Sequence, residues 1–368
     1  MHTPTFLPSS RTHPKPLQLL ERLKRADVPL SAPVSASASG FAPAQLGGET
    51  VIVIPPGTGG VHDYAQILNR HIPGRILAPT RETPLADYGR GDIVLNFSGY
   101  GYHPRGIPTW LVERLTQLRA RGARVGIFFH ELFASQPPWK SAFWLGPTQR
   151  RIAAELGNLA DYWLTNCQMA AQWLQAHCKA VPHRVLPVYS NVGEPPVRQS
   201  PRGSTIVVFG GPSIRSQAYA RLDASFWRWA TEEGLAVHDI GPPIGSSEYE
   251  RLCDSQRIHA HGSLPADLVS QRLAEARFGL LCYPPHVVAK SGVFAAYSAH
   301  GVCTILLADR YQTHDGLVPG HHYAPGPSAA TGGQAKFEDI GSAAFDWYQP
   351  HRVDAHAQAF RDLMRSTS

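Results

Sequence analysis

Four short segments of this 368-residue sequence carry glycines or polar side chains suited to binding a charged ligand. The first, PGTGGVHDY, places Gly59 and Gly60 between an apolar run and a helix-forming stretch. Glycine lets the backbone approach a ligand closely, and the unpaired N–H groups at the start of a helix attract anions. The segment is not a P-loop, because no Gly-Lys-Ser/Thr follows, and it is not a complete GxGxxG, because His62 stands at the third glycine position. A tight strand–helix turn is the alternative interpretation.

The second segment, FFHEL, places His130 and Glu131 at the end of an expected strand. Ligands of open α/β sheets bind outside the carboxyl ends of the strands. A histidine there can donate to a sugar hydroxyl or a phosphate, or carry a proton. A structural contact of His130 with the backbone is the alternative, and the absence of HExxH argues against a zinc protease.

The third segment, VVFGGPSIR, combines a glycine turn at Gly211 with Arg215 just after it. A guanidinium group binds phosphate through two parallel hydrogen bonds and keeps its charge. The segment therefore predicts a phosphate contact, with a surface arginine as the alternative.

The fourth segment, VVAKSGVFAAYSAHG, begins an expected helix with Lys290, Ser291, Gly292 and Val293. An ammonium group, a hydroxyl and free helix N–H groups together suit a diphosphate. We favour this function over an ordinary helix cap.

Strands and helices alternate along the chain in two runs of similar length, separated by the polar break SPRGS near residue 200. This alternation predicts parallel sheets with right-handed crossovers. The expected fold is therefore α/β, with two Rossmann-like domains facing a cleft. The expected parts are a flexible extension at 1–48, an N-terminal domain at 49–195, a C-terminal domain at 202–342 and a helix at 343–368 interrupted near Pro350.

The composition restricts the class of protein. A formal charge of +6 and a pI of about 9.1 suit anionic partners, but no zinc-finger spacing or dense Lys/Arg run indicates nucleic acid. The five cysteines form no CxxC pair, so neither a disulfide framework nor a structural zinc site is expected. No apolar stretch reaches the ~18 residues of a membrane span. We expect a cytoplasmic protein without a metal site.

The N-terminal extension contains PLQLLERLKRAD, residues 16–27, which can form a short basic amphipathic helix. Such a helix would contact a membrane surface or a partner. A frayed helix or a disordered tail is the favoured alternative.

Taken together, the segments resemble the GT-B glycosyltransferases, and within them glycosyltransferase family 4, over roughly residues 50–365. PGTGGVHDY resembles the family's Gly-Gly loop, FFHEL its His-Asp/Glu step, and DYWLTNCQMAAQWL the strand–helix before the interdomain linker. VVFGG with Arg215 resembles the start of the second domain, and GLLCYPPHVVAKSGVFAAYSAHGVCTIL the donor-binding strand–helix–strand. WYQPH resembles the C-terminal helix that crosses back to the first domain.

The chain departs from the family at one important place. Family members usually have two glutamates eight positions apart in the donor-binding segment, the second of which holds the ribose of the donor. When Gly301 is aligned with the family's glycine, Val288 and Ala296 occupy these positions.

The resemblance implies a glycosyltransferase that moves a sugar from a nucleotide-diphospho-sugar to a glycan or lipid-linked acceptor, with retention and without a metal or other cofactor. His130, Arg215 and Lys290 would be catalytic, with Arg215 and Lys290 stabilising the leaving diphosphate. Polysaccharide biosynthesis is the implied setting, with contact at the inner membrane face left open. The implied substrate-binding residues are Gly59, Gly60, Glu131, Gly211, Ser291, Gly292 and Val293.

Two alternatives stay open. A sugar-nucleotide epimerase of the same fold would use acidic and histidine side chains, for which Glu131 and His62 are available. A catalytically inactive GT-B-like protein would bind a sugar nucleotide or a partner without turnover, and the missing glutamates favour it. An oxidoreductase is disfavoured, because neither glycine-rich turn has the full dinucleotide fingerprint.

Overall fold

The computed structural model describes residues 49–367, apart from 90, 135–140, 199–201, 256 and 329–333. The expected flexible extension at 1–48, with its basic amphipathic segment, lies outside the described residues. Contacts join the described residues into one compact unit. This unit contains two parallel sheets, which confirms the α/β fold class expected from the alternating pattern.

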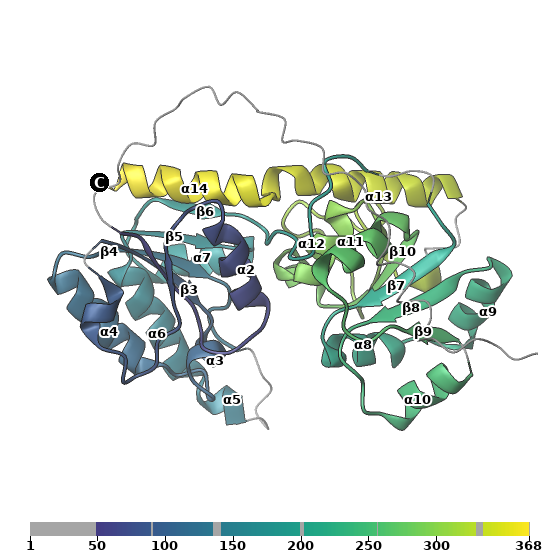
Figure 1. Ribbon diagram of the computed structural model, residues 1–368, viewed down its shortest axis with the longest axis horizontal. Helices are drawn as coiled ribbons and strands as arrows, with labels where there is room; N and C mark the ends of the chain where they lie inside the picture. Colours follow the sequence, from purple (N-terminus) through teal and green to yellow (C-terminus); the bar gives the residue numbers. More distant parts are fainter. Residues whose placement is uncertain are drawn as a thin grey trace, which may run out of the picture. The chain divides into compact units, whose positions relative to one another are not determined.

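The first sheet has six parallel strands in the order β2-β1-β3-β4-β5-β6, of which β3 to β6 are labelled in Figure 1. Its central strands β3 and β4 are buried almost throughout, as expected for apolar strands covered by helices on both faces. The strands are β1 Val51–Val53, β2 Arg75–Leu77, β3 Asp92–Phe97, β4 Arg124–Phe129, β5 Tyr162–Thr165 and β6 His183–Val185.

The helices of this half connect successive strands. Gly122 follows α4 with a φ of 89°, a conformation that glycine adopts without strain and that ends the helix. The elements are α2 Gly60–Asn69, η1 Leu85–Tyr88, α3 Gly99–Tyr102, α4 Thr109–Ala120, α5 Ser141–Trp144, α6 Gly146–Leu159 and α7 Gln168–His177.

The second sheet also has six parallel strands, in the order β12-β11-β10-β7-β8-β9. The chain order reverses between β7 and β10, which is the kind of switch point where α/β sheets bind ligands. The strands are β7 Thr205–Phe209, β8 Ala236–Ile240, β9 Ile258–Ala260, β10 Phe278–Cys282, β11 Cys303–Leu307 and β12 Ala324–Pro325.

The helices of the second half include one that the sequence pattern did not indicate. Helix α10 begins after Ser246, whose hydroxyl accepts a hydrogen bond from the backbone N–H of Tyr249 and so caps the helix. The elements are α8 Pro212–Tyr219, α9 Ala224–Glu232, α10 Ser247–Asp254, α11 Ala266–Glu275, η2 Pro285–Lys290 and α12 Gly292–Ala299.

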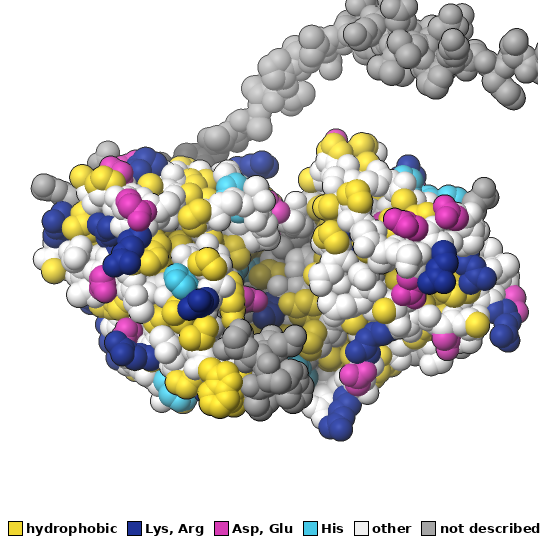
Figure 2. Space-filling model, turned by 90° about the horizontal axis from the view of Figure 1, so that it is seen from below, with side chains coloured by type: hydrophobic (Ala, Val, Ile, Leu, Met, Phe, Trp, Pro, Cys, Tyr) yellow, Lys and Arg dark blue, Asp and Glu magenta, His cyan; other side chains and the backbone are white. Residues whose placement is uncertain are grey.

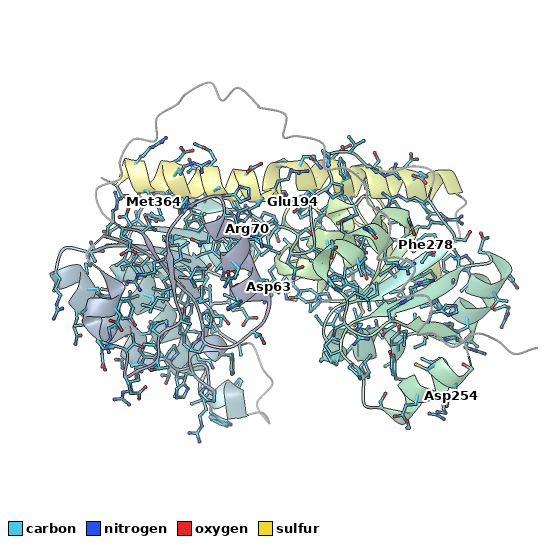
Figure 3. All side chains as sticks on the ribbon, in the orientation of Figure 1. Asp63, Arg70, Glu194, Asp254, Phe278 and Met364 are labelled. Carbon is cyan, nitrogen blue, oxygen red and sulfur yellow. The ribbon has the colours of Figure 1, made fainter. Side chains whose placement is uncertain are left out.

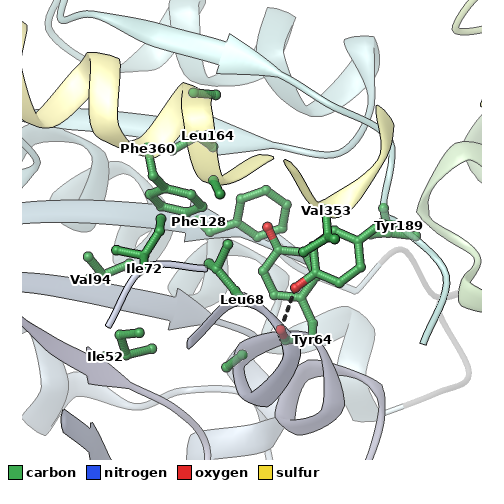
Figure 4. Close-up of a cluster of buried hydrophobic side chains, with 14 of the residues drawn as sticks. Ile52, Tyr64, Leu68, Ile72, Val94, Phe128, Leu164, Tyr189, Val353 and Phe360 are labelled. Atoms are coloured by element: carbon green, nitrogen blue, oxygen red, sulfur yellow. Dashed lines mark hydrogen bonds between the residues drawn. The ribbon is translucent and has the colours of Figure 1, made fainter. Parts of the chain in front are cut away.

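The C-terminal segment forms α13 Gln334–Tyr348 and α14 Val353–Ser366, separated by the short turn η4 Gln349–His351 that contains Pro350. Helix α14 packs against α2, and its apolar side chains join the core beside the first sheet (Figures 1 and 4). Phe360 lies near Phe128, and the Tyr64 hydroxyl lies 2.8 Å from Nδ1 of His356. The last helix therefore helps to fix α2, which carries the glycine loop at its start.

Candidate functional site

The carboxyl ends of β3, β4 and β5 meet the starts of α2 and α12 around a cavity of about 260 Å³, which we call the charged pocket. It brings together five residues that the sequence analysis singled out from separate segments. They are Gly60, His130, Glu131, Lys290 and Gly292.

An ion pair crosses the charged pocket. Nζ of Lys290 lies 3.5 Å from Oε1 of Glu131, and both side chains keep contact with solvent. The hydroxyl of Ser98 donates to the other carboxylate oxygen of Glu131 at 3.4 Å. A partly exposed ion pair at this separation contributes little free energy. An anion that binds in the pocket can therefore replace Glu131 as the partner of the ammonium group.

His130 is an uncharged member of the pocket. The residue is only 7% exposed, and burial, assisted by nearby His356, lowers the pKa of His130 to about 3. Nε2 lies 3.1 Å from Oδ1 of Asn96, so Nε2 carries the hydrogen and Nδ1 the lone pair. His130 therefore adds no positive charge near neutral pH, and suits a hydroxyl rather than a phosphate.

Helix α12 presents its N-terminus to the charged pocket. Ser291 is the N-cap, and its Oγ accepts from the backbone N–H of Phe294 at 3.3 Å. The N–H groups of Gly292 and Val293 belong to the first turn, which has no intrahelical acceptors. A Cβ at Gly292 would meet open space, so the backbone here is accessible to a ligand. Together with Lys290, this arrangement suits a diphosphate.

Two asparagines line the charged pocket with a buried acceptor that has no partner. Asn166 donates its Nδ2 to the carbonyl of His130 at 3.0 Å, and Asn191 donates its Nδ2 to Oδ2 of Asp63 at 3.3 Å. In both residues the Oδ1 atom is buried and accepts no hydrogen bond from the described residues. Buried acceptors of this kind can take a hydrogen bond from a bound donor, such as the hydroxyl of a ligand or a water molecule.

A second cavity of about 410 Å³ adjoins the first, and Asn191 lines both. We call it the α2 pocket, because Asp63 and Arg70 of α2 contribute its charged side chains (Figure 3). Its remaining walls come from the ends of β7 and β8, the segment after β9 and the start of α11. Apolar residues predominate in the lining as a whole: Ile67, Val192, Phe209, Ile240, Pro242, Leu264, Ala266 and Val269.

The predicted glycines lie at helix starts. Gly59 precedes α2 with a φ of 138°, which a residue with a Cβ rarely adopts, and Gly60 is the first residue of that helix. Gly211 is the N-cap of α8, and a Cβ there would meet open space. His62 lies in the first turn of α2.

The structure gives Arg215 a different environment from the one expected of a phosphate ligand. The residue is 0% exposed, and its guanidinium is paired with the buried carboxylate of Asp239. The remaining nitrogens donate to the carbonyls of Gly210 and Pro242. Because the partner lies on β8, 24 residues away in sequence, the arginine's inward orientation was not evident from its own segment. Arg215 instead holds the loops that wall the α2 pocket.

The α2 pocket itself was missed by the sequence analysis. Asp63, Ile67 and Arg70 follow the spacing i, i+4, i+7, which places them on one face of a helix. The predicted helix after the glycine loop could therefore have indicated a charged face beside the ligand. Asn191 and the segment after β9 carried no comparable signal.

The described residues contain neither a cluster of metal-ligating side chains nor a membrane-spanning helix. No group of three or more His, Cys, Asp or Glu side chains converges there as a metal site would require. No helix in the same residues is long and apolar enough to cross a bilayer. Figure 2 shows a face on which basic and acidic side chains are interspersed, with a hollow near its centre.

Comparisons with known proteins give structural matches only. No family model matches the chain. No curated protein matches it in sequence either. Among solved structures, HepE of Anabaena in complex with UDP is 13% identical, with a TM-score of 0.57 over 86% of this chain and 100% of that chain.

Two further structures show the same architecture. An α-glucosyltransferase in complex with UDP and a 13-mer DNA containing an HMU base is 9% identical, with a TM-score of 0.56 over 86% of this chain and 99% of that chain. A chain of the GtfA/B complex is 13% identical, with a TM-score of 0.50 over 76% of this chain, which spans only 57% of its length. With its two parallel sheets and these structural matches, the chain has the GT-B fold.

Proposed function

We propose that this protein is a glycosyltransferase that takes a sugar from a nucleotide-diphospho-sugar and transfers it to an acceptor hydroxyl. One observation carries the proposal: Lys290 and the N-terminus of α12 face His130, Glu131 and Gly60 across one cavity. An anion-binding end and hydroxyl-binding side chains thus share a single pocket. A sugar linked to a diphosphate needs both.

The diphosphate is assigned to the start of α12. Its charge would be met by Lys290 and by the N–H groups of Gly292 and Val293. Binding there would draw the ammonium group away from Glu131. The carboxylate is then free to accept a hydrogen bond from a sugar or acceptor hydroxyl.

The nucleoside is assigned to the α2 pocket. This cavity adjoins the charged pocket through Asn191, and its mostly apolar walls suit a base and ribose. Gly210, in the wall of this cavity, lies next to Val293 in the first turn of α12. A Cβ added at Gly210 would lie 3.0 Å from Cγ2 of Val293. A nucleotide with its diphosphate on α12 can therefore extend past Gly210 into this space.

The transferred sugar is assigned to the charged pocket. The buried Oδ1 of Asn166 and the neutral ring of His130 are acceptors suited to sugar hydroxyls. In the transfer, the acceptor oxygen bonds to the anomeric carbon while the bond from that carbon to the diphosphate breaks. The acceptor proton passes to the departing phosphate oxygen. Lys290 and the helix N-terminus stabilise the negative charge on the departing diphosphate without a metal. The sugar retains its anomeric configuration if the new bond forms on the same face of the sugar from which the diphosphate leaves.

A glycan or a lipid-linked sugar is the proposed acceptor, bound beside the ends of β3 and β4. The resemblance to glycosyltransferase family 4 supports this class, together with a place in polysaccharide assembly and contact with a membrane face. The UDP complexes of HepE and of the α-glucosyltransferase make UDP-sugars the first donors to test.

A second candidate, binding without turnover, is favoured by one feature. Val288 and Ala296, which replace the family's paired glutamates, are almost fully buried within an apolar cluster. The carboxylates that the family uses are therefore not replaced at these positions by another polar group.

The test is a binding and turnover screen of UDP-, GDP- and ADP-sugars, with thermal shift and release of the nucleoside diphosphate as the two measurements. We expect one nucleotide series to stabilise the protein and Lys290→Ala to weaken that stabilisation. The matched control is Lys179→Ala, which removes an exposed lysine after α7. Slow diphosphate release establishes catalysis, whereas binding without any release under acceptor supply favours the second candidate. No binding in any series refutes the proposal.

A further inference from the structure

We propose that Asp63 on α2, together with Asn191, binds the vicinal 2′- and 3′-hydroxyls of the nucleotide's ribose and makes the site selective for ribonucleotides. This inference rests on the proposed nucleotide site and assigns one of its specificity-determining contacts. It places ribose recognition on the first half of the chain, facing the second sheet's strand ends.

Asp63 and Asn191 form a pair of hydrogen-bond acceptors at the junction of the two cavities. Asn191 donates Nδ2 to Oδ2 of Asp63 at 3.3 Å, which fixes the amide so that its Oδ1 is the free acceptor. That Oδ1 is buried and has no partner among the described residues. Asp63 is only partly buried, so its carboxylate remains accessible from the α2 pocket. Two adjacent acceptors match the two O–H donors of a vicinal diol.

The described residues offer few acceptors other than Asp63 and Asn191 that could bind the ribose hydroxyls. Asp63 is the only carboxylate among the described residues that line the α2 pocket. Helix α12, with the sequence GVFAAYSA, contains no carboxylate. The hydroxyl of its Tyr297 lies 2.9 and 3.2 Å from the carbonyl oxygens of Val207 and Leu280, which share its single proton. A diol in the α2 pocket therefore has Asp63 as its charged acceptor, whereas Glu131 lies in the charged pocket.

The position along the proposed nucleotide is consistent with ribose. Ribose lies between the diphosphate and the base, and Asn191 lies between the charged pocket and the α2 pocket because it lines both. A carboxylate that accepts from a ribose hydroxyl is a common device in nucleotide-binding α/β proteins. Hydrogen bonds to charged groups are also the stronger ones, so losing one should be measurable as affinity.

The experiment compares UDP, GDP and ADP with their 2′-deoxy counterparts by calorimetric titration of the full-length protein. These probes carry no transferred sugar, so any loss on removing the 2′-hydroxyl reports on the ribose alone. The variants are Asp63→Asn, Asp63→Ala and Asn191→Ala. Glu113→Gln, which removes an exposed carboxylate on α4, is the matched control. Thermal unfolding verifies that each variant is folded.

We expect the wild type to bind one ribonucleotide about tenfold or more tightly than its 2′-deoxy form. Both Asp63 variants should reduce that ratio towards one, chiefly by weakening the ribonucleotide, and Asn191→Ala should reduce it in part. Glu113→Gln should keep the wild-type ratio. A wild type that binds both forms equally, or folded Asp63 variants that keep the full preference, overturns the inference while leaving the nucleotide site standing. A wild type that binds none of the six nucleotides overturns the proposed function as well.

Discussion

The carboxylate of Asp315 caps a helix that begins 147 residues earlier in the chain, by accepting a hydrogen bond from the backbone N–H of Gln168 at 2.6 Å. Cys167, the N-cap residue of α7, supplies no side-chain cap of its own. Asp315 and Gly316 both have positive φ, in a turn closed by the bond from the N–H of Leu317 to the carbonyl of His314. This turn directs the carboxylate to the positive end of α7 and thereby ties the second half of the chain to the first.

Removing this cap should destabilise the protein measurably. Asp315→Gly keeps the backbone freedom of the turn but removes the acceptor, and we expect a loss of about 1 kcal/mol in the free energy of unfolding. Asp315→Asn keeps an acceptor and tolerates the positive φ, so its loss should be smaller. Urea unfolding checks both. Equal losses for the two variants would show that the carboxylate does not act as a helix cap.

The buried pair of Arg215 and Asp239 should be a structural necessity rather than a substrate contact. Arg215→Ala leaves the carboxylate of Asp239 buried with one partner fewer, which costs about 3–5 kcal/mol. The hydroxyls of Tyr219 and Tyr249 still donate to Asp239, both at 2.7 Å. Arg228→Ala, at an exposed position of α9, is the control and should change stability by no more than about 0.5 kcal/mol. A stable Arg215→Ala protein that specifically loses nucleotide affinity would restore the direct contact expected from the sequence.

A negative charge at the start of α12 should separate ligand binding from stability. Gly292→Asp adds its side chain in open space, and an acidic residue in the first turn favours the helix, so we expect unchanged or slightly higher stability. The same charge repels a diphosphate, and the affinity for a nucleoside diphosphate should fall by about tenfold or more. Gly292→Asn is the neutral control of similar size. Calorimetric titration measures the nucleotide affinity of both variants, and thermal unfolding measures their stability. An unaltered affinity in Gly292→Asp would show that the diphosphate binds elsewhere.

Stability should fall as the pH is lowered from 7 to 5, because several histidines are buried in the neutral form. Burial lowers the pKa of His356 to about 3, and that of His300 to about 4. Between an ordinary histidine pKa near 6.5 and these values, the unfolded chain binds protons that the folded chain does not. Each such group therefore destabilises the fold by up to about 2 kcal/mol at pH 5.

His356 offers a direct test of this pH dependence. It joins the Tyr64 hydroxyl to the carbonyl of Pro187, at 2.8 and 2.9 Å, and His356→Gln can keep an acceptor and a donor without titrating. We expect this variant to be less stable at pH 7.5 but to lose less stability on acidification than the wild type. His177→Gln, at an exposed position of α7, should retain the wild-type slope. Unfolding free energies in urea at pH 7.5 and 5.0 provide the comparison.

The sequence by itself determined the parts of this protein that depend on local signals. Apolar strand runs, glycine turns and helix-forming stretches predicted both parallel sheets and the break at Pro350, because each signal lies within the element that it describes. The rule that ligands bind at strand ends singled out His130 and Glu131, and the rule that helix starts attract anions singled out Lys290. The structure places all three in one pocket. Their catalytic roles stay predictions.

Tertiary structure alone decided which polar side chains line a cavity and which are already paired with other groups of the protein. The side chain of Arg215 is buried because it pairs with Asp239 on β8. Asp315 caps α7 because the fold places its turn beside the start of that helix. Asp63 and Asn191 became neighbours although 128 residues separate them. Burial and hydrogen-bond pairing depend on segments remote in sequence, so the residue type at one position cannot reveal whether its charge is free or already satisfied.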